Sequence, residues 1–227
     1  MRIIFVRHGH PDYKNDCLTE LGHLQAEAVA KRLAGEIIDK FYSSSCGRAY
    51  ETAEHIAKDR GAEIEKLDFM REIGWGPVGG RGENGYDPWS LSAKIVQENN
   101  SLLSPTWDTE EPFSLSFTTD RAKTVGEEFD KLLRELGYER EGYFYRVVEP
   151  KYENVLLTSH GGSSTAVLSR IFNLPMPFVS TAICPGFTAV TVVSFSVEKG
   201  SLVSPRFEIV NDARHIAGIT VENVYGV

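Results

Sequence analysis

The stretch RIIFVRHGH, residues 2–10, gives the clearest indication of the fold class. Its first part, residues 2–6, is a short run of β-branched and aromatic residues, which predicts a buried strand at the start of the chain. Arg7, His8 and Gly9 come directly after that run. In open α/β sheets, ligands bind at the carboxyl ends of the strands, so these side chains stand where a site is expected.

A second stretch, NVLLTSHGG at residues 154–162, repeats this arrangement. Residues 154–158 predict a buried strand, and His160, Gly161 and Gly162 follow it. Because parallel strands end at the same edge of a sheet, we expect the two strand-ending histidines to meet. A glycine beside each histidine lets backbone N–H groups approach an anion, and a helix starting near Ser163 directs its positive end to the same place.

The segments between these stretches alternate between strand and helix signals. Thr19 is the expected N-cap of a helix with Leu21, Leu24, Ala28 and Leu33 on its apolar face and Gly35 as its stop. A strand at 39–43, a helix ending at Gly61 and a strand at 62–67 follow. This alternation predicts parallel strands joined by crossover helices.

The remaining sequence completes an α/β architecture. Residues 118–137 predict a helix, and alternating residues at 187–197 and 206–211 predict strands at the end of the sheet. The stretch 74–117 is rich in Gly, Pro, Trp, Asn and Ser, with a short helix expected near 90–99. We predict a single domain over 1–227, a three-layer sandwich whose mostly parallel central sheet is flanked by helices. A cap-like insertion at 74–117 lies over the active edge and selects the substrate.

Composition restricts the partners. The 227 residues carry a net charge of −8, which argues against nucleic acid and anionic membrane surfaces because both require a basic footprint. Three scattered cysteines suggest reduced thiols. The N-terminal apolar run is too short for a signal peptide or a membrane span, so the expected location is the cytoplasm.

Arg48 adds a third element to the expected site. It stands at the start of the helix after the 39–43 strand, where the helix dipole favours acidic residues. A bound anion would resolve this conflict, and the planar guanidinium grips phosphate oxygens in a bidentate manner. The sequence therefore predicts Arg7, His8, Arg48 and His160 around one anion.

Five motifs, in order along residues 2–162, give the chain a resemblance to the histidine phosphatase superfamily, the branch with phosphoglycerate mutase and fructose-2,6-bisphosphatase. Each motif is weak alone, and together they are a strong signal. They are Arg7-His8-Gly9; Leu18, Thr19, Gly22, Gln25 and Ala26; Ser44, Arg48, Ala49, Thr52 and Ala53; Glu72 in MREIGWG; and Ser159 to Gly162. The resemblance implies a phosphoglycerate mutase-like fold.

The resemblance also implies roles. His8 would attack phosphorus and form a phosphohistidine, in the manner of a histidine acid phosphatase acting on a phosphomonoester. Glu72 would donate the proton, with Glu83 as the alternative acid, and bound phosphate would raise the carboxyl pKa. The catalytic set is thus His8, Glu72, Arg7, Arg48 and His160, and the substrate contacts are Arg7, Asn15, Arg48, His160 and Gly161. The expected partner is a small phosphorylated molecule, with no cofactor and no metal.

Other functions stay open at this point. Phosphoglycerate mutase-type transfer is one, although the loop after Glu72 has few basic residues, mainly Arg81 and Lys94. A metal-dependent hydrolase with zinc on His8 and His10 is another. A phosphate-binding protein without catalysis is a third. The sequence leaves the particular phosphate ester, the role of His10 and the oligomeric state undetermined.

Overall fold

A six-stranded sheet forms the centre of the molecule. The computed structural model describes residues 1–74, 93–183 and 185–219. The strand order is β11-β9-β1-β8-β4-β5. The β1, β8, β4 and β5 strands are parallel, and β9 and β11 add an antiparallel edge. These strands are β1 (Arg2–Arg7), β4 (Lys40–Ser44), β5 (Ile64–Leu67), β8 (Asn154–Ser159), β9 (Val190–Ser194) and β11 (Arg206–Asp212).

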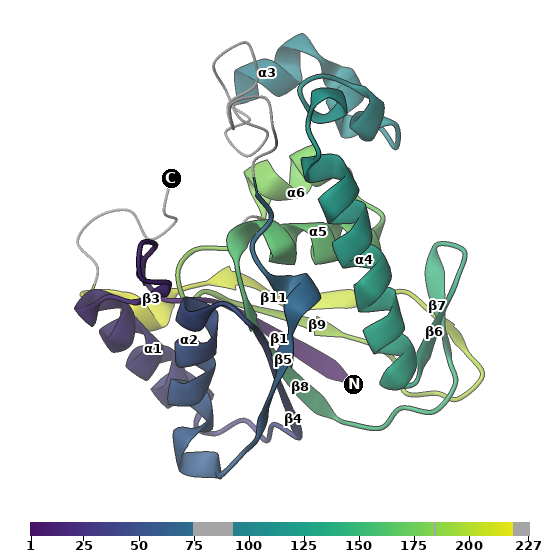
Figure 1. The fold of residues 1–227 in the computed structure, drawn as a ribbon. Coiled ribbons are helices and arrows are strands. Elements are labelled where there is room, and N and C mark those ends of the chain that lie inside the picture. The colour runs from purple at the N-terminus through teal and green to yellow at the C-terminus, as the bar shows by residue number, and fades with distance from the viewer. Residues whose placement is uncertain (75–92, 184, 220–227) are drawn as a thin grey trace.

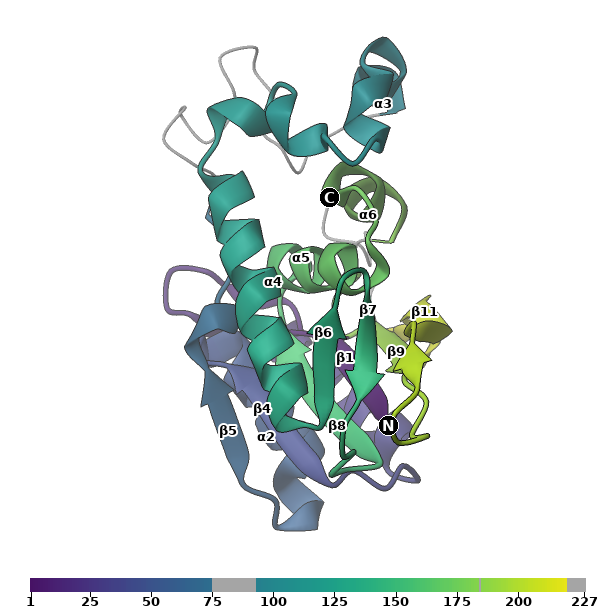
Figure 2. The same cartoon turned by 90° about the vertical axis from the view of Figure 1, so that its right-hand side faces the viewer.

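Helices cover both faces of this sheet (Figures 1 and 2). On one face lie α1 (Glu20–Leu33) and α2 (Gly47–Ala57), and on the other lie α4 (Thr118–Glu135) and α5 (Gly161–Phe172). The predicted three-layer α/β sandwich is therefore confirmed. Two shorter helices, α3 (Ala93–Glu98) and α6 (Met176–Ala182), lie beyond one end of the sheet, on the side away from the N-terminus (Figure 1).

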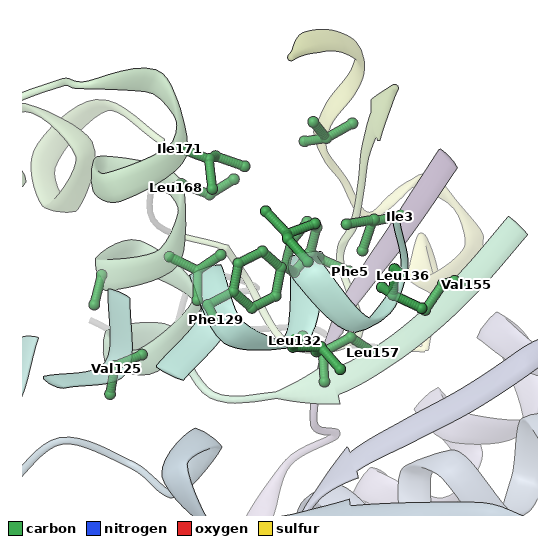
Figure 3. Close-up of a cluster of buried hydrophobic side chains, with 14 of the residues drawn as sticks. Ile3, Phe5, Val125, Phe129, Leu132, Leu136, Val155, Leu157, Leu168 and Ile171 are labelled. Carbon is green, nitrogen blue, oxygen red and sulfur yellow. The ribbon is translucent and has the colours of Figure 1, made fainter. Parts of the chain in front are cut away.

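Successive side chains of β1 contribute to two different hydrophobic cores, one on each face of the sheet. Ile3 and Phe5 face α4 and α5, where they join the larger cluster with Phe129 (Figure 3). Ile4 and Val6 point the other way and pack against α1 and α2. Successive side chains of a strand point to opposite faces, so a strand covered on both sides must be apolar throughout. The continuous apolar run that predicted β1 has this cause.

The sequence predicts the position of α1 correctly, but it does not predict which face of this helix is buried. Thr19 caps α1 by accepting a hydrogen bond from the Gly22 amide. The predicted apolar stripe is only partly correct, because Leu33 is buried whereas Leu24 is 53% exposed. The buried positions are Gly22, Gln25, Ala26, Val29 and Leu33. Small residues occupy that face because the loop after β1 packs closely against it: a Cβ on Gly9 would lie 2.5 Å from the Gly22 carbonyl oxygen.

The 74–117 stretch is described in part. The short helix expected near 90–99 is α3, and 3-10 turns follow at Asn100–Leu103, Trp107–Thr109 and Phe113–Leu115. Leu102 and Phe113 are fully buried beside Trp107. Glu83, Arg81 and the rest of 75–92 lie outside the described residues. That 74–117 acts as a cap within one domain stays a prediction.

Some elements were not predicted. A hairpin of β6 (Tyr138–Glu141) and β7 (Phe144–Val147) pairs with β10 (Leu202–Val203) in a second sheet. The β2 (Pro11–Asp12) and β3 (Cys17–Leu18) strands form a small ribbon after β1. Further 3-10 turns occur at Lys58–Arg60, Asp68–Met70 and Arg214–Ile216. None of the helices within the described residues has the length and apolar character needed to cross a membrane.

Candidate active site

The register of three neighbouring strands assembles the site. In β1 and β8, Arg7 pairs with Ser159, so His8 and His160 follow their strands at the same level. The His8 amide continues this ladder by donating to the Ser159 carbonyl at 2.9 Å. The two imidazole centroids are 5.1 Å apart. The predicted meeting of the two strand-ending histidines therefore occurs, and its cause is the in-register parallel pairing.

His8 is fully buried and held in one tautomer. Its Nδ1 lies 2.7 Å from the Gly9 carbonyl oxygen, which only accepts, so Nδ1 carries the proton. Its Nε2 accepts from Nε of Arg48 at 3.4 Å. Burial above all, and then the charge of Arg7, hold the pKa of His8 well below its usual 6.5. The ring is therefore neutral near pH 7, with the Nε2 lone pair facing Arg48.

Gly9 has a packing role as well. Besides the close approach to α1, its amide donates to the Thr52 hydroxyl at 3.1 Å. The Gly9 N–H is thus already used within the protein.

Asp16 resolves the charge conflict at the start of α2. One carboxylate oxygen accepts from the Gly47 amide at 2.9 Å, and the other pairs with an Nη atom of Arg48. An acid at a helix N-terminus is favourable, and here Asp16 supplies it from the turn between β2 and β3. Asp16 occupies one side of the guanidinium, while Nε of the same group faces His8. The Arg48 side chain is almost completely buried, so this pairing fixes its direction.

Arg7, the last residue of β1, lies beside His8 and acts on its charge. Its guanidinium donates to the Pro185 carbonyl at 2.9 Å and lies 4.4 Å above the Phe187 ring. Phe187 also contacts the His8 ring, with centroids 5.7 Å apart. Arg7 and Arg48 thus place two buried positive charges beside one neutral imidazole, which is an environment that attracts a phosphate group.

Glu72 joins the site by capping α5. Its Oε1 accepts from the amides of Ile73 at 3.0 Å, Gly162 at 3.0 Å and Ser163 at 3.2 Å. The N-terminal amides of α5 are therefore bound to a carboxyl group of the protein rather than left open to a ligand. Burial raises the pKa of Glu72 above its usual 4.5, against the opposing effect of these amides and of Arg7 and Arg48. With Oε1 occupied by donors, a proton on the group resides on Oε2.

His160 is bonded on its other nitrogen. Its Nε2 lies 2.8 Å from the Ser44 hydroxyl, and its Nδ1 is buried with no hydrogen-bond partner among the described residues. Burial, and then the neighbouring His8, hold the pKa of His160 well below 6.5. Gly161 begins α5 beside it and is buried.

Two further candidates lie at the edge of the cluster. Asn15 is exposed, and its side-chain amide donates to Asp12 at 2.8 Å rather than to any of the clustered residues. The His10 ring lies against Phe187 with centroids 5.6 Å apart, and its Nδ1 is 2.9 Å from the Thr19 hydroxyl. Within the described ranges, no group of three or more His, Cys, Asp or Glu side chains is arranged to hold a metal ion.

The model of the histidine phosphatase superfamily (branch 1) matches residues 3–207 of the chain. The chain belongs to this superfamily.

Three similar proteins illustrate the range of this superfamily. A 2,3-bisphosphoglycerate-dependent phosphoglycerate mutase of Thermoplasma acidophilum is 33% identical over 47% of this chain, and the match spans only 58% of that mutase. A putative phosphoserine phosphatase 2 of Hydrogenobacter thermophilus is 26% identical over 74% of this chain and 76% of its own length. The phosphoserine phosphatase of Entamoeba histolytica, solved with phosphoserine, superposes with a TM-score of 0.63 at 21% identity, covering 95% of this chain and 98% of that one.

Two residues of this histidine phosphatase were missed by sequence reasoning. Asp16 gave a weak signal, because a helix with no acid in its first turn and an arginine at its second position needs a negative group from elsewhere. Ser44 was part of a quoted motif, but its role depends on the register of β4 against β8, where Ser43 pairs with Thr158. No pattern within one segment contains that register.

Proposed function

We propose that this histidine phosphatase hydrolyses a phosphomonoester of a small molecule through a covalent phosphohistidine on His8. The observation that carries the proposal is the state of that ring. His8 is buried and neutral, its Nδ1–H is fixed on the Gly9 carbonyl, and its Nε2 lone pair faces a buried arginine. A neutral imidazole with one oriented lone pair is a competent nucleophile toward phosphorus.

The first step forms the phosphoenzyme. Nε2 of His8 attacks phosphorus, the ester P–O bond breaks, and the leaving oxygen takes the proton from Oε2 of Glu72. Arg7 and Arg48 balance the charge on the non-bridging oxygens. The resulting ring is positively charged because it keeps its Nδ1 proton, and the 2.7 Å bond to the Gly9 carbonyl stabilises that charge.

The second step reverses the proton transfer. The Glu72 carboxylate takes a proton from water, the hydroxide oxygen attacks phosphorus, and the P–N bond breaks. The positively charged ring is a better leaving group than a neutral one would be, and its departure restores neutral His8. Glu72 suits both steps because burial raises its pKa, whereas three amide donors keep its position constant.

Transfer to a second alcohol instead of water is the alternative, since some relatives are named as mutases. A mutase must hold a phosphorylated acceptor beside the phosphoenzyme. Lys94, one of the few basic residues of the stretch after Glu72, is exposed and paired with Glu98 at 3.7 Å. No described contact favours a second phosphate site, so hydrolysis is the function that we propose.

The test is a screen of small phosphate esters with the wild-type protein and His8→Ala in parallel. The panel contains phosphoserine, 3-phosphoglycerate, sugar phosphates and 4-nitrophenyl phosphate, each with and without EDTA and vanadate. We expect phosphate release by the wild type alone, unaffected by EDTA and inhibited by vanadate, which imitates five-coordinate phosphorus. Equal turnover by both proteins would remove His8 from the mechanism, and loss of turnover in EDTA would favour the metal-dependent alternative with His8 and His10.

A further inference from the structure

The hydrogen bonds of Ser44 determine which ring nitrogen of His160 carries its proton. Ser44 Oγ lies 3.2 Å from the Cys46 amide, which donates, and 2.8 Å from Nε2 of His160. A hydroxyl has one proton to donate. Among the described residues, Nε2 of His160 is the acceptor within reach of that proton, since the Cys46 N–H is itself a donor.

The tautomer of His160 follows from this accounting. If Ser44 donates to Nε2, then Nε2 is unprotonated and Nδ1 carries the hydrogen. That Nδ1 atom has no hydrogen-bond partner among the described residues, although His160 has no exposed surface. An unsatisfied buried N–H is costly, and such groups in native proteins generally have a ligand or a special role.

The charges around the ring point to the same conclusion. His8, Arg48, Arg7 and Arg71 all disfavour an imidazolium at this position. His160 therefore serves as a neutral ring, and a neutral ring can bind an anion only by donating a hydrogen bond. Without a fixed tautomer, the molecules that carry the proton on Nε2 would present the lone pair of Nδ1 to the phosphoryl oxygens and repel them.

We propose that Ser44 is a positioning residue that fixes His160 as the Nδ1–H tautomer, so that this nitrogen donates to a phosphoryl oxygen of the substrate. The inference rests on the proposed function of the site, and it adds a residue whose hydroxyl acts only through His160. Ser44 reaches that position because β4 and β8 are parallel and end at the same level.

The decisive experiment measures the tautomer directly. In two-bond ¹H–¹⁵N correlation spectra of the wild-type protein near pH 7, we expect His160 to show a protonated Nδ1 and an unprotonated Nε2. Vanadate should shift the Nδ1 resonance. In Ser44→Ala the two nitrogens should approach intermediate values, and Ser44→Thr, which retains the hydroxyl, should restore the wild-type pattern.

Activity provides the second readout. Removing one preorganised donor costs about 10²–10³ in kcat, and since Ser44→Ala weakens the tautomer preference rather than removing the donor, we expect a loss of roughly tenfold in kcat with KM little changed. Ser44→Thr should recover most of it. The matched control is Ser45→Ala, because among the described residues the hydroxyl of Ser45 bonds to Arg71, at 3.3 Å, and not to His160.

Two results would overturn the inference: a proton on Nε2 of His160 in the wild type, or an Nδ1 resonance that vanadate does not shift. If Ser44→Ala fails to fold, the wild-type spectra and Ser44→Thr still decide the tautomer. If no ester is turned over by any variant, the proposed function fails, whereas the spectra continue to test the hydrogen-bond arrangement.

Discussion

The two strand-ending histidines occupy equivalent places but present opposite ring nitrogens. His8 follows β1 and uses Nδ1 to donate to the Gly9 carbonyl, which leaves Nε2 toward Arg48. His160 follows β8 and uses Nε2 to contact the Ser44 hydroxyl, which leaves Nδ1 without a hydrogen-bond partner in the part of the chain that the structure describes. Both rings are buried, and both have a pKa well below 6.5.

Position and burial alone therefore do not determine the role of a histidine in this fold. The role depends on which group of the protein bonds to the ring nitrogen that does not face the substrate. A carbonyl can only accept, so the ring beside Gly9 exposes a lone pair and suits a nucleophile. A hydroxyl that donates leaves the ring beside Ser44 with an N–H, which suits the binding of an oxyanion. Two identical side chains thereby acquire complementary functions.

The strongest test of this comparison replaces each histidine by alanine and looks for the phosphoenzyme. Without His8 there is no nucleophile, so kcat should fall at least ~10³-fold and no phosphorylated protein should form. Without His160 one donor is lost, so kcat should fall by about 10²-fold while the phosphoenzyme still forms. Rapid acid quench followed by intact-protein mass spectrometry measures the covalent species.

Phosphorylation of His8→Ala at His160 would show that the two roles have been assigned to the wrong rings. Circular dichroism of both variants controls for misfolding, which matters because both side chains are buried.

A substitution of Glu72 distinguishes proton donation by this residue from its role in holding the site together. In Glu72→Gln, the amide oxygen can still accept from Gly162 and Ser163, so the cap of α5 is retained while the proton is lost. We expect kcat for an alkyl phosphate to fall by about 10²-fold, within the usual range for general acid catalysis. For 4-nitrophenyl phosphate, whose leaving group needs no proton, the rate of phosphoenzyme formation should fall much less.

Single-turnover kinetics with both esters measures that contrast. Equal losses for the two esters would indicate that Glu72 acts through structure alone, and the proton donor would then have to be sought in 75–92, where Glu83 lies.

Much of this architecture could be predicted from the chain because it is local. The apolar runs at β1 and β8 and the Thr19 cap are patterns within a few residues, and the structure has them where they were expected. The clustering of His8, Arg48 and His160 required only that three strands, β1, β8 and β4, be parallel and adjacent. That inference is safe in an α/β sheet, where crossover connections are the rule.

What could not be predicted depends on contacts between distant segments. The buried face of α1 is set by the loop at Gly9, which demands small residues and leaves Leu24 exposed. The amides of α5 were expected to meet a ligand, but the distant Glu72 takes two of them. The pairing of Asp16 with Arg48 likewise needs the loop and α2 in place. Each case is a tertiary contact competing with a local rule.

Asp16 extends the test to the His8 side of the site, because it pairs with Arg48, whose Nε faces His8. Asp16→Asn keeps an acceptor for the Gly47 amide but removes the charge that holds Arg48. We expect kcat to fall by roughly tenfold, about 1.4 kcal/mol, since charge-assisted hydrogen bonds are worth on that order. KM should not rise, because removing a negative charge beside Arg48 favours ground-state phosphate binding. Steady-state kinetics measures the split.

Glu153→Gln is the matched control, an exposed acid at the opposite end of β8 whose loss should leave both constants unchanged. A rise in KM with constant kcat would mean that Asp16 contributes to substrate binding rather than to the orientation of Arg48.

The smallest expected effect is on stability, and it tests the shared property of the two rings. The folded pKa of His8 and of His160 is below 6.5, so the unfolded chain binds more protons than the folded one as the pH falls from 7 to 5. Their stabilisation is therefore present above pH 6.5 and lost on acidification, at up to ~1.4 kcal/mol per pH unit for each ring. The raised pKa of Glu72 acts in the opposite direction, because its stabilisation is present below pH 4.5 and lost as the pH rises through its folded value.

Two histidines outweigh one carboxyl, so urea unfolding should show a free energy of unfolding that decreases from pH 7 to pH 5. In His160→Gln the decrease should be less steep but still present, because His8, His55 and His215 also have lowered pKa values. An unchanged slope in His160→Gln would mean that the His160 ring is not held neutral.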